Sequence, residues 1–122
     1  MVKLELKNHQ VWQDFTEIVK QLDIDTLIKE HLDLCNYQVC GYWDEQDKYY
    51  QTINLPRSLE IELISSFIGF EHQKRFLQLK FNLKNLADFT KIGELLLIYD
   101  ENLQFIDENW ILDSDFLECR VR

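Results

Sequence analysis

The sequence predicts an α+β domain, in which a mostly antiparallel, twisted sheet has one or two N-terminal helices packed on it. Apolar residues recur at three- and four-residue spacing early in the chain, which is typical of amphipathic helices. Further along they alternate with polar residues, which is typical of half-buried strands. The 122 residues include three Gly and one Pro and no linker rich in them, so we expect a single globular domain over residues 1–122.

The N-terminal third is expected to be mainly helical. Residues 2–7 alternate apolar and charged side chains, as a short strand would. Asn8 is placed to cap a helix, because the apolar residues from Val11 to Leu22 then follow the helical period. Residues 23–34 predict a second helix, whose inward-facing residues would be Leu27, Ile28, Leu32 and Leu34.

The middle of the chain is expected to form strands. The aromatic and β-branched runs at residues 37–43 and 49–55 flank a polar stretch and predict a hairpin. Residues 58–70 fit either a helix ending at Gly69 or a strand, and we favour the strand because the alternation at Phe76–Leu83 predicts a partner for it.

The C-terminal part is expected to complete the sheet. Residues 85–91 predict one helical turn, closed by Gly93, and residues 94–99 are apolar enough for a central strand. The repeated Asp-Glu-Asn triplets at 100–102 and 107–109 predict two turn tips of a short meander. Alternation at residues 117–121 predicts a last strand.

Charge and cysteine content limit the classes of partner and compartment. The chain has 13 basic and 22 acidic residues, so its net charge of −9 argues against direct binding of nucleic acid or of an anionic membrane. No apolar run approaches the roughly 20 residues of a membrane helix. The three Cys residues are widely spaced, as expected for reduced thiols, so we predict a cytoplasmic protein.

Acidic residues are concentrated in one part of the chain. Residues 94–118 contain eight Asp or Glu and no Lys or Arg. They could simply fill solvated turns, or they could form a face complementary to a basic protein, in which nearby Trp and Tyr would supply contact area. On the second interpretation, the candidate partner-binding residues are Tyr42, Trp43, Asp44, Glu45, Asp47, Asp100, Glu101, Asp107, Glu108, Trp110, Asp113 and Asp115.

Catalytic and cofactor signals are weak. His31, Cys35 and Cys40, with Cys119 as a fourth ligand, come nearest to a zinc set, but no paired CxxC motif is present. There is no GxSxG, GxGxxG or GxxxxGK[ST] motif, and the paired carboxylates lie in polar stretches. We therefore expect a protein that is not an enzyme and binds no metal or cofactor.

These observations favour a small acidic binding protein that neutralises a basic partner. An immunity protein that blocks a bacterial nuclease toxin is the known category that fits, because a nuclease site is positively charged to hold phosphates. One alternative is an adaptor or homodimeric assembly domain that pairs through an exposed strand such as Phe76–Leu83. The other is a small metal-dependent enzyme using His31, Cys35 and Cys40.

Overall fold

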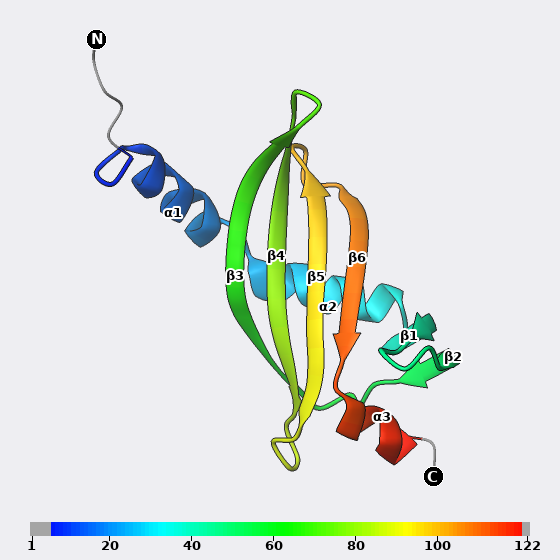
Figure 1. The fold of residues 1–122 in the computed structure, drawn as a ribbon. Coiled ribbons are helices and arrows are strands. Elements are labelled where there is room, and N and C mark those ends of the chain that lie inside the picture. Colours follow the sequence, from blue (N-terminus) through cyan, green and yellow to red (C-terminus); the bar gives the residue numbers. More distant parts are fainter. Residues whose placement is uncertain (1–5, 121–122) are drawn as a thin grey trace. The chain divides into compact units, whose positions relative to one another are not determined.

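The structure is a computed structural model that describes residues 6–120 (Figure 1). Within these residues lie three helices and six strands, and the strands form two antiparallel sheets, which confirms the predicted α+β class. The chain divides into two compact units between Asn36 and Tyr37. Across residues 6–120, no helix is both long and apolar enough to span a bilayer.

The first unit contains α1 (Val11–Gln21) and α2 (Ile24–Leu34), as the sequence predicts. The cap of α1 differs from the prediction: its N-cap is Gln10 rather than Asn8, and the backbone N–H of Val11 donates to Nδ1 of His9. The strand predicted at residues 2–7 falls mainly outside the described residues, and Leu6 lies exposed in a bend.

Helix α2 begins where its sequence predicts. The Asp23 side chain accepts a hydrogen bond from the backbone N–H of Thr26, which satisfies one of the free donors of the first turn. Ile28 and Leu32 are buried, as expected. Leu34 was expected to face inward and is instead 87% exposed, because it lies at the end of the helix and off the face that carries Ile28 and Leu32.

The second unit begins with a hairpin of β1 (Gln38–Trp43) and β2 (Tyr49–Asn54), which confirms the predicted one. Val39 lies opposite Ile53, and both side chains are buried. The hairpin therefore has one apolar face, while its loop projects polar residues.

Four strands form the larger sheet in the order of the chain, as an antiparallel meander. They are β3 (Leu59–Glu71), β4 (Lys74–Asn85), β5 (Lys91–Asp100) and β6 (Phe105–Leu112). The strand interpretation of residues 58–70 is confirmed, and a register shift between Leu63 and Ser65 explains why their pattern was ambiguous. A bulge there breaks the period of two and imitates a helical spacing.

The core of the sheet lies on one face of its two central strands. Along β4 and β5, alternate residues are buried, and they pair across the strands, as at Leu79 with Leu97 and Phe81 with Leu95. Leu63 on β3 and Trp110 on β6 extend the row through Phe81 and Leu95 to both edges. The strict alternation seen in the sequence therefore marks the buried face correctly.

The predictions for the C-terminal part need correction at three points. The N–H of Phe89 donates to the carbonyl of Asn85, which closes one helical turn at residues 86–88 as predicted, but Gly93 does not end it and lies inside β5. The triplet at 107–109 is not a turn tip but part of β6, paired with β5. Residues 117–120 of the predicted last strand belong to α3 (Ser114–Arg120), and residue 121 lies outside the described residues. Asp113 caps this helix: its Oδ1 accepts the N–H of Asp115, and its carbonyl accepts the N–H of Leu117.

The suggestion that Phe76–Leu83 offers an exposed strand edge is also wrong. That segment lies in β4, which pairs with β3 on one side and β5 on the other. Both of its backbone edges are occupied. The edge strands of this sheet are β3 and β6.

Candidate partner-binding surface

The loop of the β1–β2 hairpin is built around one carboxylate. Oδ1 of Asp44 accepts the backbone N–H groups of Gln46 and Lys48, each at 2.9 Å, and Oδ2 accepts the hydroxyl of Tyr50 at 3.3 Å. Asp47 adopts a positive φ of 60°, which Asp tolerates better than most residues. Asp44 therefore holds the loop in one shape, and this part of the acidic content has a structural purpose.

These hydrogen bonds change the ionisation of both side chains. The N–H of Lys48 is the main cause that lowers the pKa of Asp44 below its usual 3.8, and the N–H of Gln46 and the Tyr50 hydroxyl add to it. Burial raises the pKa of Tyr50, and the negative charge of Asp44 raises it further. Both groups therefore hold their neutral-pH states, an ionised carboxylate and a protonated phenol.

The stability of the protein should fall in acid partly because of Asp44. Its pKa is lower in the folded state than in the unfolded state, so its contribution is present above pH 3.8 and disappears as the pH falls through the folded pKa. Asp44→Asn keeps an oxygen that accepts the N–H groups but does not titrate. Urea unfolding midpoints from about pH 7 to about pH 2 should therefore fall less for Asp44→Asn than for the natural chain.

A matched control is Glu45→Gln, which removes the same charge one residue along, at an exposed side chain. Its unfolding midpoint should follow the natural chain in acid. If Asp44→Asn and the natural chain lost the same stability in acid, the hydrogen bonds of Asp44 would not be a source of acid sensitivity.

A hydrogen bond joins the hairpin to the end of the large sheet. The backbone N–H of Leu112 donates to the hydroxyl of Tyr42 at 2.9 Å. Beyond Leu112, the N–H of Asp113 donates to the carbonyl of Ile92 at 2.8 Å, and α3 follows. The hairpin loop, the end of β6 and the start of α3 are thereby held around one hollow.

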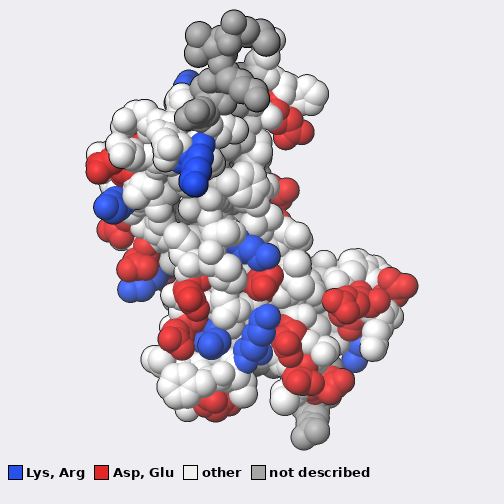
Figure 2. Space-filling model, turned by 60° about the vertical axis from the view of Figure 1, so that its left-hand side comes forward, with Lys and Arg blue, Asp and Glu red and all other residues white. Residues whose placement is uncertain are grey.

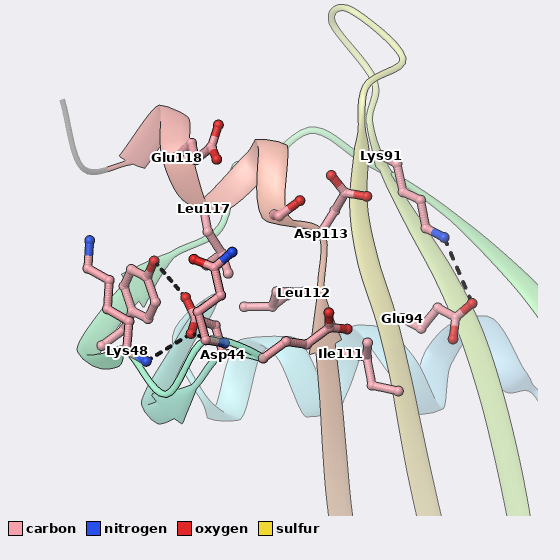
Figure 3. Close-up of a pocket in the computed structure, with 13 residues that line it drawn as sticks. Asp44, Lys48, Lys91, Glu94, Ile111, Leu112, Asp113, Leu117 and Glu118 are labelled. Carbon is pink, nitrogen blue, oxygen red and sulfur yellow. Dashed lines mark hydrogen bonds and ion pairs between the residues drawn. The ribbon is translucent and has the colours of Figure 1, made fainter.

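This acidic hollow has a volume of about 610 Å³. Ile111, Leu112 and Leu117 give it an apolar part, and Figure 3 shows Leu112 between Asp44 on one side and Glu94 on the other. Five of its side chains carry a carboxylate and two an ammonium group, so its net charge is −3. Its lining consists of Asp44, Glu45, Gln46, Lys48, Tyr50, Lys91, Glu94, Ile111, Leu112, Asp113, Ser114, Leu117 and Glu118.

The carboxylates of the acidic hollow differ in how far they are neutralised. Glu94 lies 3.3 Å from Nζ of Lys80 and 3.9 Å from Nζ of Lys91. Glu45, Asp113 and Glu118 form no ion pair with any Lys or Arg of residues 6–120. In Figure 2, acidic side chains gather at the lower right, over the hairpin and α3. Three unpaired carboxylates of the acidic hollow therefore lie at this end of the sheet.

The structure separates the predicted site residues into groups. Asp44, Glu45 and Asp113 line the acidic hollow, and Asp47 and Asp115 are exposed on the adjoining loop and helix. Asp100 and Glu101 lie at the far end of β5, about 30 Å away at the usual rise of a strand. The predicted site therefore combines residues from opposite ends of the sheet. Only the set at the hairpin end lines the acidic hollow.

The far end of the sheet repeats the design of the hairpin loop. Oδ1 of Asp100 accepts the N–H groups of Asn102 and Gln104 at 2.8 and 2.9 Å, and Leu103 has a φ of 60°. Glu101 is paired with Arg75 at 2.7 Å. These carboxylates are largely committed to the turn and to an ion pair.

On β6, Asp107 also acts locally. Its Oδ1 accepts the backbone N–H of its neighbour Glu108 at 2.8 Å. Both residues lie on the edge strand, between the acidic hollow and the far turn. They extend the negative charge along this edge without forming part of the cavity.

The two candidate tryptophans differ in accessibility. Trp43 is 62% exposed and lies next to Tyr49, with ring centroids 4.9 Å apart, so it is available to a partner. Trp110 is only 8% exposed, because its place opposite Leu95 turns it to the buried face. Its Nε1 is buried without a hydrogen-bond partner among residues 6–120. Tyr42 is half-buried and already bonded to Leu112.

The predicted metal alternative finds no geometric support. Within residues 6–120, no group of three or more His, Cys, Asp or Glu side chains is arranged to hold a metal ion. His31 and Cys35 belong to the first unit and Cys40 to the second, and all three cysteines are free thiols.

Several residues of the acidic hollow were not identified from the sequence. Glu94, Glu118 and Lys91 come from separate elements, and only folding places them beside the hairpin loop. The alternation of β5 does indicate that Glu94 points away from the buried face, but no pattern in the sequence shows what lies next to it. Comparison of the chain with models of protein families, curated proteins and solved structures produced no match.

Proposed function

We propose that this chain is a small cytoplasmic binding protein that neutralises a basic protein, with an immunity protein against a nuclease toxin as its specific form. One observation carries the proposal: the acidic hollow combines unpaired carboxylates with an apolar part. It acts by occupying the partner's surface and is not an enzyme.

The chemistry of the acidic hollow suits Lys and Arg side chains. Their ammonium or guanidinium groups would lie among Glu45, Asp113 and Glu118, while their methylene stems would cover Ile111 and Leu112. Trp43 and Tyr49 are exposed on the strands of the same hairpin and would add rigid aromatic area outside the hollow. A nuclease surface is basic in order to hold phosphates, so the same charges would speed association and block the substrate.

Neutralising the acidic hollow should slow association with the partner. Glu45→Gln, Asp113→Asn and Glu118→Gln remove three charges together, and Asn preserves the cap of α3. With the tagged chain as bait, the basic protein recovered from the source organism is purified and its association rate is measured. We expect a rate about tenfold lower for the triple variant at about 0.05 M salt, and a smaller difference at about 0.5 M salt.

The matched control neutralises Glu60, Glu62 and Glu71 to Gln on β3, the opposite edge strand, and changes the net charge equally. Its association rate should stay within about twofold of the natural chain. Equal losses in both triple variants would show that only the total charge matters and would overturn the role of the acidic hollow. A recovered protein whose nuclease activity is unaffected by an equimolar amount of the chain would overturn the immunity function.

A further inference from the structure

The longest strand of the large sheet lies at its edge. Strand β3 spans 13 residues and pairs with β4, and no strand of residues 6–120 pairs with its other side. After the bulge near Leu63, residues 65–71 pair with β4 in unbroken register. A long, regular segment of β3 therefore has backbone N–H and C=O groups available along its outer edge.

Apart from the bulge at its start, this open segment lacks the features by which proteins protect sheet edges. Residues 63–70 contain no charged residue and no proline, although Lys and Pro are the usual means of blocking an edge. Four of its apolar side chains are at least 40% exposed: Ile64, Phe67, Ile68 and Phe70. On one face, Phe67 meets the ring of Phe76 edge-on, with centroids 6.2 Å apart.

The opposite edge strand, β6, is protected. The Leu112 N–H faces away from β5 and is taken by the Tyr42 hydroxyl. Residues two apart in a strand face the same way, so the Glu108 N–H also points to the outer edge, where the Asp107 carboxylate accepts it. Two copies of β6 side by side would also bring the carboxylates of Asp107 and Glu108 together. Of the two edge strands of this sheet, only β3 offers an uncharged and unblocked stretch, at residues 63–70.

We propose that two copies of this chain pair through β3, antiparallel and about a two-fold axis beside Phe67, which joins the two four-stranded sheets into one of eight strands. In this register Phe67 faces its own copy, and Ser65 faces Gly69. Residues 64–70 then each lie opposite another uncharged residue, and Leu63 lies opposite Glu71 of the other copy. Glu62 and Glu71 lie outside the paired core, so two acidic chains can approach here without opposing like charges.

The partner at the β3 edge is a second copy of this chain, because the uncharged segment can pair with itself without opposing like charges. A basic partner would find no carboxylate on this segment, whereas the acidic hollow lies at β5, β6 and α3. The dimer therefore goes beyond the proposed function, and each can fail without the other.

Sedimentation of the full chain over a range of concentrations tests the dimer. We expect the mass to rise from 14.8 kDa to twice that value. Phe67→Lys places two ammonium groups face to face, and should weaken dimerisation on the order of tenfold or more. Because Phe67 also contacts Phe76, Ser65→Lys is a second variant at an exposed side chain with the same expected result. Phe105→Lys on β6 is the matched control and should leave the dimer unchanged.

Cross-linking tests the register. The variant Phe67→Cys is made in a chain with Cys35, Cys40 and Cys119 replaced by Ser. It should form a disulfide dimer under mild oxidation, because the Cα atoms of facing residues in antiparallel strands lie about 4.5–5.5 Å apart. Phe105→Cys in the same background should not. A single species of 14.8 kDa up to about 1 mM would overturn the proposal. So would a dimer that Phe105→Lys disrupts and the two β3 variants leave intact.

Discussion

Replacing Phe81 with alanine is expected to lower the free energy of unfolding by about 3–5 kcal/mol, the usual cost of removing a fully buried aromatic ring. Phe81 is 1% exposed and lies on β4, in the row that runs from Leu63 through Leu95 to Trp110. The loss comes from the apolar area no longer buried and from the cavity left among these side chains. Urea unfolding, with the midpoint and slope determined separately, measures it.

The control for this substitution is Phe70→Ala on β3. Phe70 is 76% exposed, so its removal should change the free energy of unfolding by less than about 0.5 kcal/mol. If the two substitutions had equal effects, the row through Phe81 would not be the centre of the hydrophobic core.

Replacing Gly93 with alanine is expected to lower the free energy of unfolding by about 3 kcal/mol or more. A Cβ at this position would lie 2.4 Å from the carbonyl oxygen of Ile111 and 2.8 Å from Cα of Leu112. Both contacts are with backbone, so β5 and β6 would have to separate where they now pair. Ile111 and Leu112 also line the acidic hollow, so we expect weaker partner binding together with the loss of stability.

Gly41→Ala separates the steric effect from the effect of backbone conformation. Gly41 has a φ of 69°, but the nearest atom to an added Cβ is the Tyr49 hydroxyl oxygen at 3.7 Å, an ordinary contact. Gly41→Ala should lower the free energy of unfolding by about 1 kcal/mol, because a residue with a Cβ is less stable than Gly in the left-handed conformation. Hydrogen exchange of the β6 amides should rise in Gly93→Ala and not in Gly41→Ala. Unchanged β6 protection in Gly93→Ala would contradict the contact with Ile111.

Regular periodicity predicted the regular elements correctly. In α2 the apolar residues follow the helical period, and in β4 they alternate without interruption, so local pattern and buried face agree. Helix α1 forms as its period predicts, although none of its residues is buried. The pattern was ambiguous in β3, where a bulge interrupts it. It was misleading at α3, because a helix of seven residues is too short for its period to outweigh a chance alternation at Leu117 and Cys119.

The acidic surface was only partly predictable. Carboxylates beside aromatic residues suggested contact residues, but the sequence does not distinguish Asp44 and Asp100, which hold turns, from Glu45, which has no such task. It also does not show that Trp110 turns inward while Trp43 stays exposed. That difference depends on the pairing of Trp110 with Leu95 on the neighbouring strand.

The sequence by itself determined the α+β class, the hairpin, the helices of the first unit and the excess of negative charge, because each depends on composition or on neighbours within a few residues. Only the tertiary structure decided which strands lie at the sheet edges and which carboxylates surround a hollow. It brings Asp44, Glu94 and Glu118 together from separate elements, and long-range pairing of this kind depends on strand register and packing, which no local pattern encodes.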